Sequence, residues 1–211
     1  MSRARDGGGS RRGRRRREAD PHAEEAARRF DAGTSGSIES AIESTAARHP
    51  DAPRPTANHV RRHLRGLAEE RLGREGYLQW QAEVLRRALE VMEGLAGERV
   101  VLAGRAAQGL LDGDPSLSLR VETARPIGEL AEVLVGFGFP EPEFDSMKCQ
   151  VGRLDRLRFH DEGVEVTLVR CPPAQVSPGR RDLVTGEPVA TLDEASLRRV
   201  IDCLERGQDP F

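Results

Sequence analysis

The sequence predicts an α/β chain of the α+β type: a small mixed β-sheet with packed helices, preceded by a helical N-terminal region. Three observations support this. Apolar residues recur with a helical period through residues 20–96, short alternating stretches follow within residues 97–211, and an arginine-rich stretch, residues 1–19, comes before both. We therefore expect a tail, a helical region and an α/β domain, in that order.

The first eighteen residues carry eight arginines against Asp6 and Glu18, and no large aliphatic side chain after Met1. Such a composition cannot form a core, so we expect a disordered tail. Two roles stay open for it. It either serves as a solvated tail or makes a weak, sequence-independent contact with nucleic-acid phosphates through residues 11–17. We expect no basic stripe in residues 20–211 to cooperate with it.

The remaining composition limits the class of protein. The chain has 211 residues and a net charge of −2, and no apolar run approaches the length of a membrane span. Three cysteines, odd in number and far apart, are typical of free thiols in a reducing cytoplasm. His59 and His63 are spaced for one helix face, but further ligands are missing nearby, so we expect no metal and no cofactor.

The helical region has recognisable starts. Residues 24–30 form a short amphipathic stretch, and Ser37 is a suitable N-cap for residues 38–48. Thr56 is a second N-cap, and the longest helix is expected over residues 76–95. The spacing of their apolar residues predicts that each helix buries one face.

The pattern changes after Gly97. We expect strands over residues 100–103 and 116–121, a helix over 126–136, and a final helix over 193–206. Between these helices, residues 153–159 and 164–169 are expected to pair as strands around a four-residue loop, 160–163. The predicted common core is Leu102, Leu117, Leu119, Leu134, Phe159, Val166, Leu168 and Ile201.

The order of these elements resembles the minimal nucleotidyltransferase-like fold. In that family a strand leads to a Gly-Ser turn, and the next strand carries two aspartates on alternate residues. A third carboxylate lies on a later strand. Alternate residues of a strand face the same side, so the carboxylates reach a shared pair of magnesium ions. The preceding helices and the loop over residues 180–188 look like those of a group of bacterial proteins with this fold.

The specific residues of that family are replaced here. Gly109 occupies the glycine turn, where Leu110 replaces the hydroxyl, and Ser116 and Ser118 stand at the two aspartate positions, with Thr167 at the third. Neutral hydroxyls are poor magnesium ligands. The resemblance therefore implies a pseudoenzyme of the bacterial cytoplasm that has lost two-metal catalysis. It would act as a binding or regulatory module for a nucleotide or a protein partner.

An active enzyme is the alternative. Asp112, Asp114 and Glu165 lie close in sequence to the replaced positions, and as displaced carboxylates they would hold Mg²⁺ for nucleotidyl transfer. The structural alternatives are a turn at Asp112-Gly-Asp-Pro115 and a solvated Glu165.

Arginines offer a route to phosphate without a metal. Arg105, Arg120, Arg180 and Arg181 could bind a nucleotide directly, or simply contribute surface charge. The sequence contains neither a P-loop ending in Gly-Lys-Ser/Thr nor a Gly-x-Ser-x-Gly elbow, which excludes those two site types.

Overall fold

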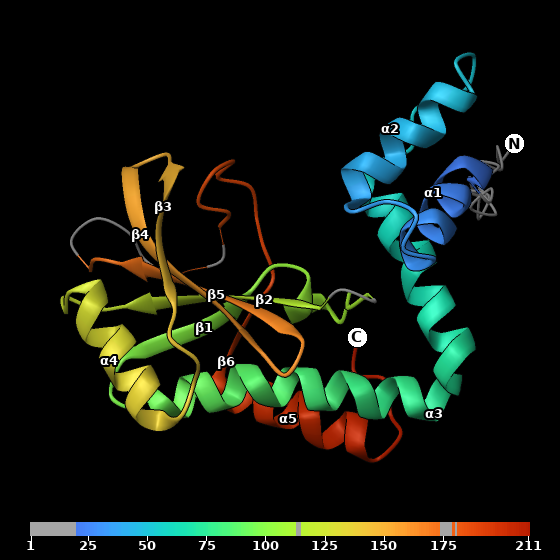
Figure 1. Cartoon of the computed structure of the whole chain (residues 1–211). Coiled ribbons are helices and arrows are strands. Elements are labelled where there is room, and N and C mark those ends of the chain that lie inside the picture. The colour runs from blue at the N-terminus through green and yellow to red at the C-terminus, as the bar shows by residue number, and fades with distance from the viewer. Residues whose placement is uncertain (1–19, 113–114, 174–178, 180) are drawn as a thin grey trace, which may run out of the picture.

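A six-stranded mixed sheet forms the centre of the α+β fold (Figure 1). The computed structural model describes residues 20–112, 115–173, 179 and 181–211. The predicted tail, Asp114 and Arg180 lie outside the described residues.

The strands follow the order β3-β4-β5-β2-β1-β6. Only β2 and β5 among the described neighbours pair in parallel, while the other pairs are antiparallel. The predicted pairing of the second strand with the first is confirmed. Two outer strands, β3 and β6, were not predicted. The bounds are β1 Arg99–Ala103, β2 Ser116–Glu122, β3 Glu143–Cys149, β4 Gly152–Asp161, β5 Val164–Cys171 and β6 Thr191–Asp193.

The helices begin where their capping residues stand. Ser37 accepts a hydrogen bond from the backbone N–H of Ser40 at 3.0 Å, and Thr56 accepts one from that of His59 at 3.3 Å, which confirms both predicted N-caps. The bounds are α1 Pro21–Asp31, α2 Ile38–Arg48, α3 Ala57–Gly94, the 3₁₀ turn η1 Ala106–Gln108, α4 Ile127–Phe137 and α5 Glu194–Glu205.

The long helix α3 has an elbow at Gly73. The sequence predicts two separate helices in this region, and the backbone agrees, because the helical geometry of α3 is interrupted at Gly73, where φ is 69° and ψ is 162°. Only glycine adopts that backbone geometry readily, so the chain bends without leaving helical structure on either side. Its first half joins α1 and α2 in what we call the helical arm, residues 21–72 (Figure 1).

Two separate hydrophobic clusters lie on either side of this elbow. In the larger one, α3 from Leu78 onward, α4 and α5 pack on one face of the sheet, and every predicted core residue is buried there. The helical arm has its own small cluster. Packing therefore changes at Gly73, within the expected helical region 20–96 and not at its end.

The β4–β5 hairpin is tighter than the sequence predicts. His160 and Asp161 are not loop residues, because they pair with Glu165 and Val164 of β5. The turn is Glu162-Gly163, with φ values of 47° and 80°. Two consecutive positive φ values are typical of the turn that matches strand twist in two-residue hairpins.

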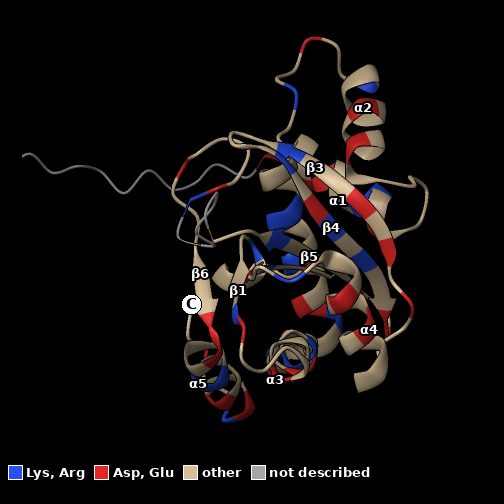
Figure 2. Cartoon of the chain, turned by 90° about the vertical axis from the view of Figure 1, so that its left-hand side faces the viewer, with Lys and Arg blue, Asp and Glu red and all other residues tan. Residues whose placement is uncertain are grey.

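The second face of the sheet carries polar side chains, and we call it the open face. Acidic and basic residues stand side by side on β3 and β4 (Figure 2). The segment after β5 covers part of this face, where Leu183 packs against buried Leu154 and Val169. In the part of the chain that the structure describes, no helix combines the length and apolarity needed to cross a membrane.

Candidate functional site

Three hydroxyl side chains gather on the open face, and we call Ser116, Ser118 and Thr167 the hydroxyl patch. Parallel pairing of β2 with β5 places Ser118 opposite Thr167 and Ser116 opposite Glu165. All four residues are half-buried. Residues opposite each other on paired strands point to the same face of the sheet. The three positions that correspond to the family's carboxylates are therefore neighbours in space.

Basic side chains adjoin the patch on β4. Arg158 stands opposite Thr167, and His160 stands opposite Glu165. The Arg158 guanidinium lies 3.6 Å from the carboxylate of Glu143 and 3.5 Å from that of Asp145 on β3. Arg158 is therefore neutralised at one end of the patch.

Asp112 connects the helical arm to the sheet. Its side chain is only 2% exposed, and Oδ2 accepts hydrogen bonds from Arg61 of α3 at 2.9 Å and from Arg105 at 3.0 Å. A second Arg105 nitrogen donates to the hydroxyl of Ser116 at 3.2 Å. Arg105 thus spans the distance between the buried carboxylate and the hydroxyl patch.

The second half of α3 holds the loop that carries Asp112. The Tyr77 hydroxyl donates to the Leu111 carbonyl at 2.8 Å, and the Gln81 amide donates to the Gly109 carbonyl at 2.9 Å. Burial raises the pKa of Tyr77 to about 12, so the phenol remains a donor across the physiological pH range. The loop is therefore fixed from the helix side of the sheet.

Gly109, which the resemblance aligns with a glycine turn, occupies a position that suits glycine alone. Gly109 has φ 67° and ψ 17°, in the left-handed region. The ring of Phe211 lies directly against its Cα, where a Cβ atom would overlap it. Backbone geometry and a close approach both require glycine here.

Replacing Gly109 with alanine is expected to lower the free energy of unfolding by about 1–2 kcal/mol, the usual cost of left-handed geometry for other residues. Urea unfolding measures this, and the loss should shrink in a Phe211→Ala background, where the overlap is removed. Gly128→Ala is the matched control, since that helical glycine has open space around it. An equal loss in both glycine variants would contradict the assignment.

A cavity of about 230 Å³ opens beside this turn, and we call it the arginine pocket. Four arginines thus line one pocket, in a part of the chain where the sequence predicts no basic stripe. Arg61, Arg62 and Arg65 come from α3, and Arg105 comes from the turn. The pocket is lined by Asn58, Arg61, Arg62, Arg65, Arg105, Gln108 and Leu110.

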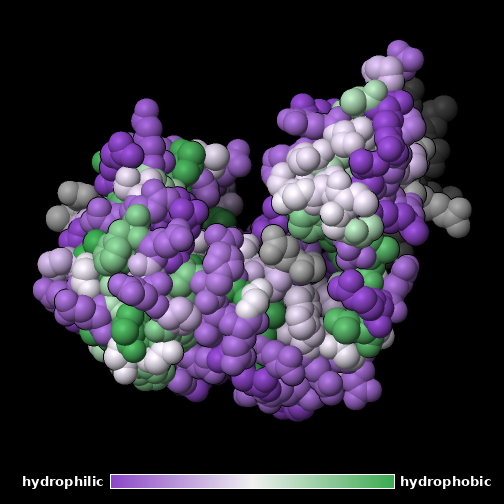
Figure 3. Space-filling view, viewed as in Figure 1, coloured by the Kyte–Doolittle hydropathy of each residue, from purple (hydrophilic) through white to green (hydrophobic). Residues whose placement is uncertain are grey.

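Carboxylates balance part of this charge. Asp112 pairs with Arg61 and Arg105, and Asp209 lies 3.3 Å from Arg65. Arg62 is exposed to solvent. Figure 3 shows a hollow between the helical arm and the part of the molecule that contains the sheet.

Two of the other predicted arginines have structural contacts. Arg120 is buried on the open face of β2 and donates to the carbonyls of Gly179 and Arg181. Arg181 donates to the Gly186 carbonyl. These contacts hold Gly179 and Arg181 against β2. Among the predicted arginines that the structure describes, Arg105 is the one with a hydrogen bond to the hydroxyl patch.

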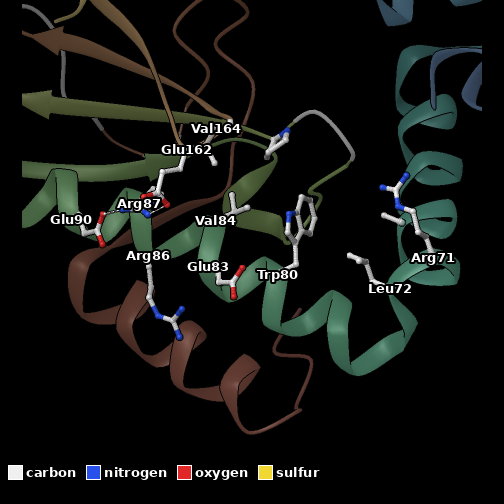
Figure 4. Close-up of a pocket in the computed structure, with 13 residues that line it drawn as sticks. Arg71, Leu72, Trp80, Glu83, Val84, Arg86, Arg87, Glu90, Glu162 and Val164 are labelled. Atoms are coloured by element: carbon white, nitrogen blue, oxygen red, sulfur yellow. Dashed lines mark hydrogen bonds and ion pairs between the residues drawn. The ribbon is translucent and has the colours of Figure 1, made fainter. Parts of the chain in front are cut away.

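A second cavity lies at the inside of the bend in α3. Its volume is about 590 Å³, and Trp80 faces Arg71 and Leu72 across it (Figure 4). Arg87 on its wall pairs with Glu90 at 2.7 Å and also with Glu162. Its described lining contains none of the candidate site residues predicted from the sequence.

Comparison with known proteins adds no further constraint. No protein-family model matches the chain, and a search of curated proteins finds no match. The residues and their geometry carry the functional argument.

Proposed function

We propose that this chain is a nucleotidyltransferase-like protein that has lost two-metal catalysis and binds a nucleotide through arginines as a regulatory module of the cytoplasm. The observation that carries the proposal is the contact between Arg105 and Ser116. A cation stands beside a hydroxyl at the position where the resemblance implies a metal-binding carboxylate. Arginine suits a phosphate directly, because its planar fork donates two parallel hydrogen bonds.

The surrounding charge supports this proposal. Four arginines line the pocket, and their carboxylate partners among the described residues are Asp112 and Asp209. A polyphosphate supplies the negative charge that such a pocket attracts. The hydroxyls of Ser116, Ser118 and Thr167 add neutral donors to phosphate oxygens without demanding a metal.

An aromatic ring favours a nucleotide over a bare phosphate. Phe211 rests against Gly109 and keeps 42% of its surface exposed, and both neighbours of Gly109 line the pocket. Bases stack on exposed aromatic rings with a gain of about 1–3 kcal/mol. A base lying over Phe211 would place its phosphates toward the arginines.

Calorimetric titration of the full chain with ATP, in EDTA and then in excess magnesium, tests the proposal. We expect binding in EDTA with no gain from magnesium. Arg62→Ala should weaken it about 10- to 100-fold, because a hydrogen bond from a charged group contributes about 1.5–3 kcal/mol. Arg199→Ala is the matched control: that exposed arginine is on α5, outside the pocket. Equal affinities for both variants would remove the pocket from the proposal.

A transfer assay distinguishes this function from the active alternative. The Asp112 carboxylate is buried between two arginines, an arrangement that neutralises its charge before any cation arrives. We expect no magnesium- or manganese-dependent transfer of radiolabelled nucleotide. Transfer that is abolished by Asp112→Ala, Asp114→Ala or Glu165→Ala would instead establish an enzyme with displaced carboxylates.

A further inference from the structure

The helical arm brings together two histidines and a glutamate that are distant in the chain. His22 and Glu25 lie three residues apart on α1, and His49 is the C-cap residue of α2. A spacing of three residues puts two side chains on the same helix face. One ligand atom from each of the three residues lies within 4.8 Å of the others. In the part of the chain that the structure describes, this is the group of three that meets the distance needed for a metal ion.

We infer that His22, Glu25 and His49 form a binding site for a divalent transition metal, with Zn²⁺ as the best-fitting ion. Two imidazoles and one carboxylate are a recurrent zinc ligand set, and they leave a fourth position for water. Imidazole favours zinc over magnesium or calcium, which prefer sites made of oxygen ligands alone. The inference concerns the helical arm and is independent of the nucleotide pocket.

The geometry is close to what zinc requires. Nε2 of His49 lies 2.8 Å from Oε2 of Glu25, and the rings of His22 and His49 have centroids 4.6 Å apart at an angle of 47°. Bonds of about 2.0–2.1 Å around a tetrahedral zinc place its ligand atoms about 3.3 Å apart. The ligand atoms lie within 4.8 Å of one another, so binding zinc requires them to draw closer together.

The surroundings orient the glutamate and leave a path for the ion. The second carboxylate oxygen of Glu25 lies 3.5 Å from the guanidinium of Arg48, and such outer contacts hold metal ligands in place. The side chain of Glu25 is 32% exposed and that of His49 is 41% exposed. The site is therefore partly enclosed but open to water on one side.

The arm also has a structural use for a metal. Half of its buried cluster is alanine, and the aliphatic side chains Ile38, Ile42, Val60 and Leu64 make up the rest. A core with such small side chains buries little apolar surface, and small units of this kind commonly rely on a metal or disulfide. A zinc ion held by α1 and the end of α2 would fasten the two shortest helices of the arm together.

The test uses the full-length, tag-free chain after removal of metals with EDTA. Zinc is titrated in competition with a chromophoric chelator, and cobalt is added separately for its visible spectrum. We expect one equivalent of zinc, a four-coordinate cobalt spectrum, and a higher melting temperature of the arm with zinc. His22→Ala and His49→Ala should each weaken zinc binding at least about 10-fold, since even outer-contact changes cost about 10- to 100-fold.

Controls keep the result specific. His160→Ala removes an exposed histidine on β4, and Cys149→Ser removes a half-buried thiol, so both variants should bind zinc as the parent does. Glu25→Gln keeps the shape of the side chain and removes its charge, and circular dichroism verifies that each variant is folded. Zinc binding that survives in the His22→Ala/His49→Ala double variant, or that is lost in Cys149→Ser, would overturn the inference. Arg62→Ala should retain zinc binding, which separates this test from the nucleotide experiment.

Discussion

Replacing Asp112 with alanine is expected to destabilise the folded chain by about 3–5 kcal/mol, the cost of removing one partner from a buried ion pair. The carboxylate is 2% exposed and accepts from Arg61 and Arg105. Its removal takes the carboxylate from the guanidinium of Arg61 at the junction of the helical arm and the sheet. Urea unfolding followed by circular dichroism measures the change in the free energy of unfolding.

Two variants calibrate this result. Asp112→Asn keeps an acceptor and the volume of the side chain, so it should lose less stability than the alanine variant. Asp202→Ala, on the exposed surface of α5, should change stability by no more than about 0.5 kcal/mol. A coupling energy near zero between Asp112→Ala and Arg61→Ala in a double-mutant cycle would contradict the ion pair.

The same variant separates the two functions considered for the site. If the pocket binds ATP through arginines, loss of the Asp112 carboxylate removes a competing anion from Arg61, and the affinity for ATP should rise in the fraction that remains folded. An active enzyme that uses Asp112 as a magnesium ligand would instead lose both metal-dependent binding and transfer. Titration of the variant with ATP, at a temperature below the midpoint of its thermal unfolding, distinguishes these outcomes.

Replacing Gly73 with alanine is expected to have the next largest effect, a loss of about 2–3 kcal/mol, because its φ of 69° and ψ of 162° suit glycine alone. Part of that strain can be relieved if α3 straightens. The helical arm would then swing away from the sheet, and Arg61 would leave Asp112. Small-angle scattering should show a larger radius of gyration, together with a lower urea midpoint.

Gly66 provides a matched control on the same helix. It lies in the first half of α3, has no positive φ, and a Cβ atom added there meets open space. Alanine at this position should stabilise the helix by up to about 1 kcal/mol, opposite in sign to the change at Gly73. A loss of stability at Gly66 with none at Gly73 would refute the elbow as a glycine-dependent feature.

The parts of the fold with strong periodicity were predictable. The capping hydroxyls of Ser37 and Thr56, the alternation of β2 and the common core are all as expected. Strand β3 was missed because it carries few apolar residues at an outer position, and β6 has only three residues. The division of this region into a helix that begins after Thr56 and a second helix over residues 76–95 agrees with the break in helical geometry at Gly73.

The site was predictable only where strand register decides it. Alternation put Ser116 and Ser118 on one face, and the parallel pairing added Thr167 and Glu165. The arginine pocket depends on the elbow, which brings Arg61, Arg62 and Arg65 to Arg105 from a distant part of the chain. The clustering of these three arginines on one stretch of α3 is visible in the sequence, but their proximity to Arg105 is not. The same holds for His22 and His49, which meet because two helices of the arm pack together.

The outermost strand has a consequence for behaviour at high concentration. β3 ends the sheet, so seven residues offer one side of their backbone to any other strand that approaches. Charged side chains lie along this edge strand, namely Glu143, Asp145 and Lys148. Ion pairs with Arg156 and Arg158 connect the strand to β4. An incoming strand would have to desolvate these charges before gaining backbone hydrogen bonds. Strand β3 is thus protected against edge-to-edge pairing with other molecules, the step that begins fibril growth. The edge strand on the other side of the sheet, β6, is too short to act as a template for such pairing.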